Sequence, residues 1–283
     1  MPDLATSEGD DAQPPAPIPA STVMLLRDGA DGIEVFMVRR ATKMDFAAGA
    51  LVFPGGKVDP PDRAPLLRQR CGDVGDIDDF QLALRVAAVR ETFEECGVLL
   101  ARPHGEPNLL PEAKVRELET KYRDALTADE IGIDAVVTAE NLDLACDLLV
   151  YYAHWITPVI RPKRFDTHFF LAPTPPDQVA EHDGSESLDS LWTRPQAAID
   201  SFVAGGYQVM FPTYCNLVKL DRNATVEDAL AAGRAEPVVT VLGQHRKMPD
   251  GSRHVVIPKA AGYGVTEVPD RNEPNGKRIV DEV

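Results

Sequence analysis

The sequence predicts an α/β/α sandwich, in which a mixed β-sheet lies between helices. Short apolar segments with strand-like composition occur near the start and again in the middle of the chain, and helical patterns of 10 to 18 residues separate them. The chain has 283 residues, of which 44% are hydrophobic, so it can bury a sizeable core as one large domain or two small ones.

The first predicted elements form a β-hairpin behind a tail. Residues 1–19 are acidic and rich in proline, without a basic n-region or an apolar h-region, so we expect a disordered tail and no signal peptide. Residues 21–27 and 33–40 alternate as two strands around a turn that contains Gly29 and Gly32.

A short strand at residues 50–53 is followed by Pro54, Gly55 and Gly56. The two glycines allow a tight turn and a close approach of the backbone to a ligand. After a segment rich in Pro, Gly and Asp, an amphipathic helix is expected from Asp79, as the N-cap, to a stop at Gly97.

This helix carries three carboxylates, Glu91, Glu94 and Glu95, on one face, since they are separated by three and four residues. The opposite face is apolar and is predicted to pack against the sheet: Leu82, Val86, Val89, Phe93 and Cys96.

Glu94 and Glu95 lie in the last helical turn, where the helix dipole disfavours an acidic side chain by about 0.3 to 1 kcal/mol. Helix stability alone therefore does not explain this cluster of carboxylates, whereas a bound cation would stabilise it. The alternative is a solvated acidic face in which Arg90 bridges to Glu94. The strand and glycine turn upstream favour a phosphate and metal site.

The rest of the chain contains more of both kinds of element. Two polar helices, 111–126 and 128–141, form a helical insertion at about 105–145, and strands are expected at 148–157, 164–172 and 187–193. A helix at 195–204 follows, and the C-terminal extension, 221–283, has a short helix at 226–232 and strand-like segments at 237–242 and 254–258.

Charge and cysteine content restrict the function. The formal net charge of −16 argues against a nucleic acid or an anionic membrane as partner, and an anionic substrate then requires a bridging metal ion. The four cysteines lack CxxC spacing, which indicates neither a zinc site nor a disulfide framework and favours a cytoplasmic protein. No segment reaches transmembrane length.

The acidic helix and the glycine turn together resemble the Nudix hydrolase signature, G-x5-E-x7-R-E-U-x-E-E-x-G-U, where U is aliphatic. Asp62 stands in place of the first Glu, Thr92 replaces an aliphatic residue, and 27 residues, 63–89, separate the two halves where the signature has seven. Twenty extra residues therefore interrupt the motif. The matching positions are Gly56, Arg90, Glu91, Glu94, Glu95, Gly97 and Val98.

An interruption at this point resembles the Nudix branch that hydrolyses coenzyme A and acyl-coenzyme A. Arg40-Ala41, Gly49 and the segment 53–56 resemble a pattern of that branch, although Asp45 stands where a second Arg belongs. Further similar segments surround Trp155, Phe169 and Phe211, so that the resemblance covers residues 20–220.

The resemblance implies a metal-dependent diphosphatase that cleaves coenzyme A or its thioesters to 3',5'-ADP and (acyl-)4'-phosphopantetheine. Two alternatives are the same chemistry on another nucleoside diphosphate derivative, such as NADH or ADP-ribose, and a Nudix-like module that binds a nucleotide without turnover. The complete half-motif from Arg90 to Gly97 argues against the last, since a binding module does not need three mutually repelling acids.

Site residues follow from the same resemblance. Glu91, Glu94 and Glu95 are the expected ligands for Mg²⁺ or Mn²⁺, and Glu91 and Glu94 are also expected to be catalytic. Arg90 is a candidate for substrate binding, but an orienting role through pairing with Asp62 is favoured.

Other candidates lie outside the acidic helix. Gly55 and Gly56 are expected to contact the substrate. Arg40 is the candidate for a phosphate contact, and an ordinary surface charge at a strand end is the alternative. We expect the general base in an acidic loop that contains Glu181, Asp183 and Glu186, and Glu186 is the preferred candidate. The alternative is that this loop is only a solvated acidic segment. His154 and His168 are interpreted as packed or hydrogen-bonded core histidines, not as ligands.

Overall fold

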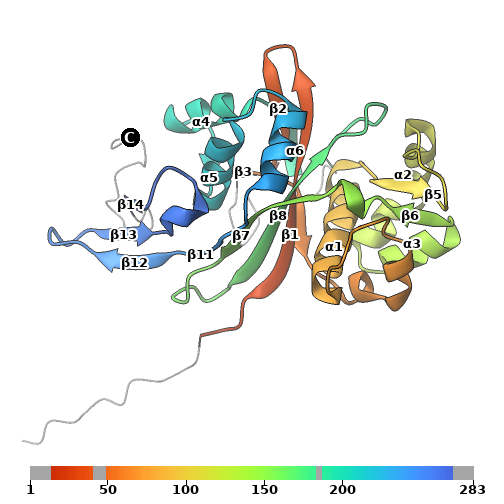
Figure 1. Cartoon of the computed structure of the whole chain (residues 1–283), viewed down its shortest axis with the longest axis horizontal. Coiled ribbons are helices and arrows are strands. Elements are labelled where there is room, and N and C mark those ends of the chain that lie inside the picture. The colour runs from red at the N-terminus through yellow and green to blue at the C-terminus, as the bar shows by residue number, and fades with distance from the viewer. Residues whose placement is uncertain (1–13, 41–48, 183–186, 270–283) are drawn as a thin grey trace, which may run out of the picture.

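A mixed nine-stranded sheet forms the centre of the computed structural model, which describes residues 14–40, 49–182 and 187–269 (Figure 1). Within these residues the strand order is β10-β3-β2-β1-β8-β7-β11, with β4 also pairing with β1 and β9 with β2. The strands are β1 (Ile18–Gly29), β2 (Gly32–Arg40), β3 (Ala50–Val52), β4 (Gly55–Lys57), β7 (Val150–Ile156), β8 (Phe165–Pro173), β9 (Ser187–Thr193), β10 (Gln208–Val209) and β11 (Thr240–Leu242).

The predicted hairpin is confirmed as β1 and β2, which pair antiparallel. Strand β1 begins at Ile18, one residue before the expected end of the tail, because it pairs in parallel with β8 from that residue. Ser21 of β1 lies opposite His168 of β8 on one side and opposite Gly56 of β4 on the other. These three residues therefore lie side by side across the sheet.

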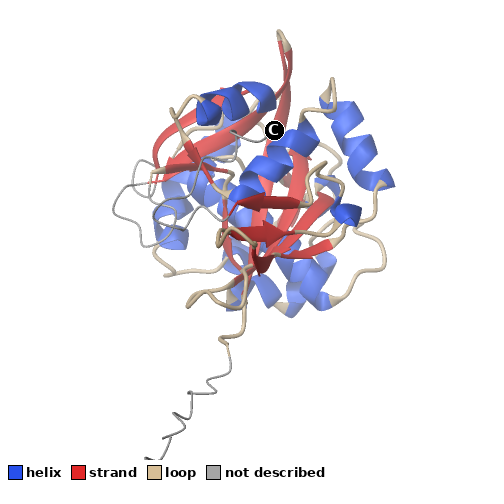
Figure 2. Ribbon diagram, turned by 90° about the vertical axis from the view of Figure 1, so that its left-hand side faces the viewer, coloured by secondary structure: helices blue, strands red, loops and turns tan. Residues whose placement is uncertain are grey.

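Helices cover both faces of the sheet, which confirms the predicted sandwich (Figure 2). One face, with Val23 and Leu25, packs against α1 (Asp79–Cys96), and the other face, with Met24 and Leu26, packs against α4 (Pro195–Val203), α5 (Phe211–Leu220) and α6 (Val226–Ala235).

Helix α1 has the expected extent, but its N-cap is Asp78 and not Asp79. The carboxylate of Asp78 accepts a hydrogen bond of 2.7 Å from the backbone N–H of Gln81. Gly97 ends the helix as predicted, with a φ of 67° in the left-handed region. Two 3₁₀ helices, η1 (Pro60–Arg63) and η2 (Pro65–Gln69), precede the helix within the interrupted motif.

The helical insertion lies against α1 (Figure 1). It contains α2 (Glu112–Thr127), α3 (Ile133–Ala139) and a ribbon of β5 (Ala101–Pro103) and β6 (Leu142–Leu144). The second helix begins at Ile133 and not at residue 128, because Asp129 adopts a φ of 56° that interrupts the helix.

The C-terminal extension completes the main sheet. Strand β11 pairs in parallel with β7, which places Thr240 opposite His154, and α6 packs on β7 and β8. Beyond it, β12 (Gln244–Lys247), β13 (Arg253–Val256) and β14 (Glu267–Pro269) form a small antiparallel sheet, with the 3₁₀ turn η4 (Lys259–Ala261) between β13 and β14. Another 3₁₀ turn, η3 (Cys146–Leu148), precedes β7. Among the described helices, none combines the length and apolarity needed to cross a membrane.

Candidate functional site

Arg90 is the centre of a buried cluster of charges. Its guanidinium donates to both carboxylate oxygens of Asp62, at 2.9 and 3.0 Å, and to the backbone carbonyl of Lys57 at 2.8 Å. The Nη1 atom donates to Glu91 at 3.0 Å and to Glu94 at 3.2 Å. The predicted pairing of Arg90 with Asp62 is confirmed, and it joins the two ends of the 27-residue segment 63–89.

The predicted alternative of a solvated acidic face is wrong, although the Arg90 to Glu94 bridge that it included is present. Glu91 and Glu94 are 8% and 9% exposed, and Asp62 is 1% exposed. The acidic face is buried because β4 and η1 lie against it, and α2 packs on α1 beside them. Thr92, the other departure from the signature, is also buried and donates to the carbonyl of Ala88.

Burial raises the pKa of Glu91 well above its usual value; Arg90 opposes this shift, and Glu95 and Glu94 add to it. Burial likewise raises the pKa values of Asp62 and Glu94, against the effect of Arg90. The carboxylates thus share one compensating cation, whose pKa is raised in turn because its ion pairs outweigh its own burial.

The glycine strand β4 lies directly against these carboxylates. The backbone N–H of Gly55 donates to Oε2 of Glu95 at 2.9 Å. A Cβ atom on Gly56 would lie 2.3 Å from Oε1 of Glu91, and one on Gly55 would lie 2.3 Å from the carbonyl oxygen of Ser21. The close approach expected of these glycines is therefore made to the protein itself, and their contact with substrate stays a prediction.

Arg123, a residue that sequence reasoning missed, stabilises the acidic end of α1. Its Nε donates to the backbone carbonyl of Glu94 at 2.7 Å, and its Nη1 bonds to Glu119. A cation at a helix C-terminus offsets the negative end of the dipole. The charge-rich pattern of α2 was visible in the sequence, but nothing in it indicated which residue reaches α1.

The donor set fits a hard divalent cation. Four carboxylates, from Asp59, Asp62, Glu91 and Glu94, form ion pairs with the single guanidinium of Arg90. Buried carboxylates in excess over cations are costly, and oxygen ligands are those that Mg²⁺ and Mn²⁺ prefer. Glu95 lies in the same last turn of α1 and is linked to β4 through Gly55.

A model of the NUDT19 Nudix domain family matches residues 59–220, which include this cluster. The chain belongs to the Nudix hydrolase family. The crystal structure of a Nudix hydrolase from Alicyclobacillus acidocaldarius is 32% identical, with a TM-score of 0.62, over 76% of this chain and 96% of that one.

Curated Nudix relatives show a more specific similarity. Acyl-coenzyme A diphosphatase NUDT19 of Homo sapiens is 28% identical over 70% of this chain, and its Gallus gallus counterpart is 27% identical over 69%. The alignment covers 63% of the length of each of these relatives.

The remaining predicted site residues have less defined surroundings. Arg40 ends β2 opposite Ser187, and its buried Nε has no hydrogen-bond partner among the described residues. Glu186 and Asp183 lie outside the described residues. The side chain of Glu181 is 66% exposed, and its backbone N–H donates to the carbonyl of Cys96, which places this loop beside the end of α1.

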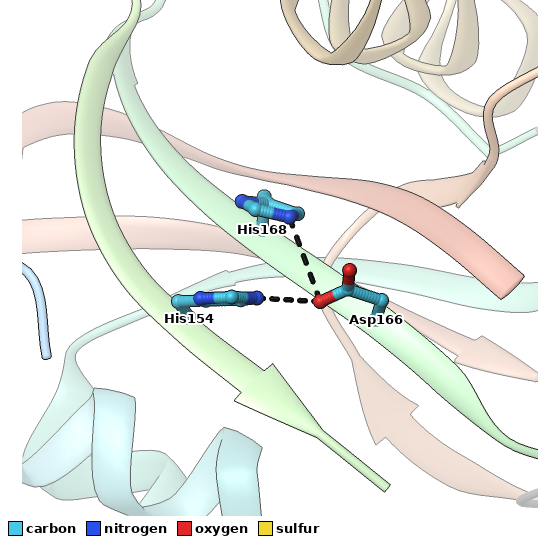
Figure 3. Close-up of side chains that lie close together, drawn as sticks. All are labelled: His154, Asp166 and His168. Carbon is cyan, nitrogen blue, oxygen red and sulfur yellow. Dashed lines mark hydrogen bonds and ion pairs between the residues drawn. The ribbon is translucent and has the colours of Figure 1, made fainter. Parts of the chain in front are cut away.

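The two histidines of β7 and β8 are packed together, as predicted for core residues. Their rings stack with centroids 4.1 Å apart, and the carboxylate of Asp166 points toward both rings (Figure 3). Burial, together with the neighbouring His154, lowers the pKa of His168 to about 4. The expectation of satisfied hydrogen bonding holds for His154, but Nε2 of His168 has no hydrogen-bond partner in the described part of the chain.

Proposed function

We propose that this Nudix protein is a metal-dependent diphosphatase that hydrolyses coenzyme A or acyl-coenzyme A to 3',5'-ADP and (acyl-)4'-phosphopantetheine. The observation that carries the chemistry is the buried excess of carboxylates around Arg90. The substrate rests on the similarity to acyl-coenzyme A diphosphatase NUDT19 and on the interruption of the motif at residues 63–89.

We propose Glu91, Glu94 and Glu95 of α1 as the ligands of Mg²⁺ or Mn²⁺. Glu91 and Glu94 are also the proposed catalytic residues of this helix. A bound divalent cation would neutralise diphosphate oxygens and orient a water molecule for attack. The burial of Glu91 and Glu94 favours this role, because a cation compensates carboxylates that one arginine does not neutralise.

Arg90 is assigned a positioning role, since its donors are engaged by Asp62, Glu91, Glu94 and Lys57. Arg40 is the proposed phosphate contact, supported by its buried Nε without a partner among the described residues. Glu186 remains the proposed general base, supported only by its place in sequence next to Ser187, which pairs with Arg40.

The net charge of −16 disfavours nucleic acid as a partner, and a small-molecule nucleoside diphosphate substrate would be held through the bridging metal ion. We also place the protein in the cytoplasm. All four cysteines, each within the described ranges, are buried thiols outside any disulfide, as expected in a reducing compartment.

The test is a hydrolysis panel with coenzyme A, acetyl-coenzyme A, NADH and ADP-ribose, each with Mg²⁺ or Mn²⁺, with the products identified by chromatography. Wild type should release 3',5'-ADP from the coenzyme A compounds, and Glu94→Gln should lose at least about 100-fold in kcat, since even outer-shell changes at metal sites cost about 10 to 100-fold. Glu117→Gln, on an exposed side chain of α2, is the matched control and should keep its activity.

Two outcomes would contradict different parts of the proposal. If wild type cleaves none of the four compounds with either metal, the enzymatic function is wrong. If NADH or ADP-ribose is cleaved much faster than both coenzyme A compounds, the diphosphatase function holds and the substrate is wrong.

A further inference from the structure

A second group of ligand-type side chains lies on the sheet itself. His154 is on β7, and Asp166 and His168 are on β8, two residues apart and therefore on the same face. His154 lies directly opposite His168 in the antiparallel register. One nitrogen of each imidazole and one oxygen of Asp166 all lie within 4.8 Å of one another.

The three side chains converge on one point (Figure 3). Oδ1 of Asp166 lies 2.5 Å from Nε2 of His154 and 3.6 Å from Nε2 of His168. The second distance is too long for a hydrogen bond. His168 is 3% exposed, so its Nε2 is a buried polar atom aimed at this point without a hydrogen-bond partner among the described residues.

The opposite nitrogen of each ring is already held. Nδ1 of His168 is hydrogen-bonded to the hydroxyl of Tyr151 at 2.8 Å, and Nδ1 of His154 to the hydroxyl of Thr240 at 2.9 Å. Such bonds fix the orientation of the ring, and in the tautomer in which Nδ1 donates to the hydroxyl, Nε2 carries the lone pair that a metal ion binds, as in metal-bound histidines. Both Nε2 atoms are therefore presented to the same space.

We propose that His154, Asp166 and His168 bind a divalent transition-metal ion of the zinc class. Two imidazole nitrogens and one carboxylate oxygen are a ligand set that zinc and its neighbours favour over Mg²⁺. The ion would satisfy Nε2 of His168 and would replace the proton shared by His154 and Asp166. It would also join β7, β8 and, through Thr240, the C-terminal strand β11.

This site is separate from the carboxylates of α1. His168 lies opposite Ser21, and Ser21 lies opposite Gly56, which contacts Glu91, so two strand spacings, about 10 Å, separate the two groups. No single ion bridges that distance. Phe80, in the first turn of α1, packs edge-on against His168 with centroids 5.7 Å apart, whereas Glu91 to Glu95 lie in its last turns.

The experiment titrates Zn²⁺ into the untagged full-length protein in excess Mg²⁺, followed by calorimetry. Wild type should bind about one equivalent of Zn²⁺ that Mg²⁺ does not displace, as expected for a site with nitrogen ligands. His154→Gln and Asp166→Asn should lose this equivalent, and Glu94→Gln should retain it. His104→Gln is the matched control, because His104 forms a separate exposed pair with Asp143 at 2.8 Å.

A spectroscopic measurement on wild type guards against variants that fail to fold. Pulsed electron paramagnetic resonance of the protein with one equivalent of Cu²⁺ should show coupling to two imidazole nitrogens, which a site of carboxylates alone would not show. The proposal is overturned if wild type binds no Zn²⁺ in excess Mg²⁺, or if folded His154→Gln and Asp166→Asn bind it as wild type does. Absence of imidazole coupling in wild type overturns it as well.

Discussion

Arg90 determines at the residue scale whether the acidic cluster can exist in a folded protein. A buried carboxylate without a partner is far more costly than a solvated one, and Arg90 bonds to three of them within 3.3 Å. The arginine therefore contributes mainly by offsetting part of the cost of burying Asp62, Glu91 and Glu94. This separates the role of Arg90 from that of a residue that touches substrate.

Replacement of Arg90 by Met should lower the free energy of unfolding of the metal-free protein by about 3 to 5 kcal/mol, the usual cost of removing one partner of a buried ion pair. Urea denaturation in the presence of a chelator measures the change. Arg68→Met is the control, since Arg68 pairs with Asp79, whose side chain is 97% exposed, and it should cost about 1 kcal/mol or less. Equal effects of the two variants would mean that Arg90 has no special role in stability.

Gly56→Ala should reduce kcat by about 100-fold, because the new Cβ would displace the carboxylate of Glu91 and small displacements of catalytic groups have effects of that size. The change is measured on whichever substrate wild type cleaves best. Gly75→Ala is the control: a Cβ there meets no atom within 4 Å, and its φ of 70° costs stability only. Activity of Gly56→Ala equal to that of Gly75→Ala would contradict the proposed role of Glu91.

At this scale the sequence predicted the residues that share one helix and the salt bridge that crosses the insertion. Glu91, Glu94 and Glu95 follow from helical spacing, and Arg90 with Asp62 from the family resemblance. Arg123 could not be predicted, because its contact with Glu94 depends on how α2 packs on α1. The unpaired nitrogen of His168 depends in the same way on the register of β7 against β8.

At the scale of elements, the helical insertion packs on α1 beside β4 and η1, which cover the acidic face. Its two helices are held together by Glu140, which ends α3 and accepts hydrogen bonds from Lys121, Tyr122 and Lys114. These bonds, that of Lys121 first, lower the pKa of Glu140 to about 2. The stabilisation that Glu140 gives to the insertion therefore depends on pH.

Glu140→Gln should lower the midpoint of thermal unfolding at pH 7, with a smaller difference from wild type at pH 3. The pKa of Glu140 is depressed in the folded state, so its stabilisation is present above the unfolded value of 4.5 and is lost as the pH falls towards 2. Calorimetric scans from pH 7 to pH 3 measure the trend, and Glu130→Gln, on an exposed residue of the α2 to α3 turn, serves as control. A difference that is the same at every pH would contradict the assignment.

Most elements were predictable because their pattern is local. Strands β1, β2, β7 and β8 alternate or are continuously apolar, and α1 and α4 have clear ends at Gly97 and Gly205. Helix α5 was not predicted, because Phe211-Pro212 was interpreted only as part of a family motif. A Pro in the first turn also favours the start of a helix, as is found here. Strands β5 and β6 are short, and they pair with each other across the two helices of the insertion.

At the scale of the whole molecule, the C-terminal extension is part of the core. Gly233 of α6 lies against Val150 and Leu171, and the indole N–H of Trp155 donates to the hydroxyl of Tyr263 at 2.9 Å. Tyr263 is 4% exposed. The sequence predicted a domain boundary at residue 220 because no recognisable motif follows it. Residues of the extension are nevertheless buried in the core, since packing does not require a sequence motif.

Deletion of residues 221–283 should abolish cooperative unfolding and cause aggregation, because it uncovers the α6 face of the sheet and leaves the edge of β7 unpaired. Thermal scans and size-exclusion chromatography make the comparison with wild type. A 221–283 deletion that unfolds with the midpoint of wild type would show that the extension is separable.

The contact between Arg90 and Asp62 also has a consequence for chain topology. The ion pair holds the two ends of segment 63–89 together, so a change in the length of this segment does not alter the geometry of the acidic cluster. Each doubling of the segment's length adds only about 0.6 kcal/mol of loop-closure entropy. The exposed stretch around Asp73 and Gly75 is therefore a natural point for inserting a foreign peptide or for splitting the chain into two fragments that reassemble.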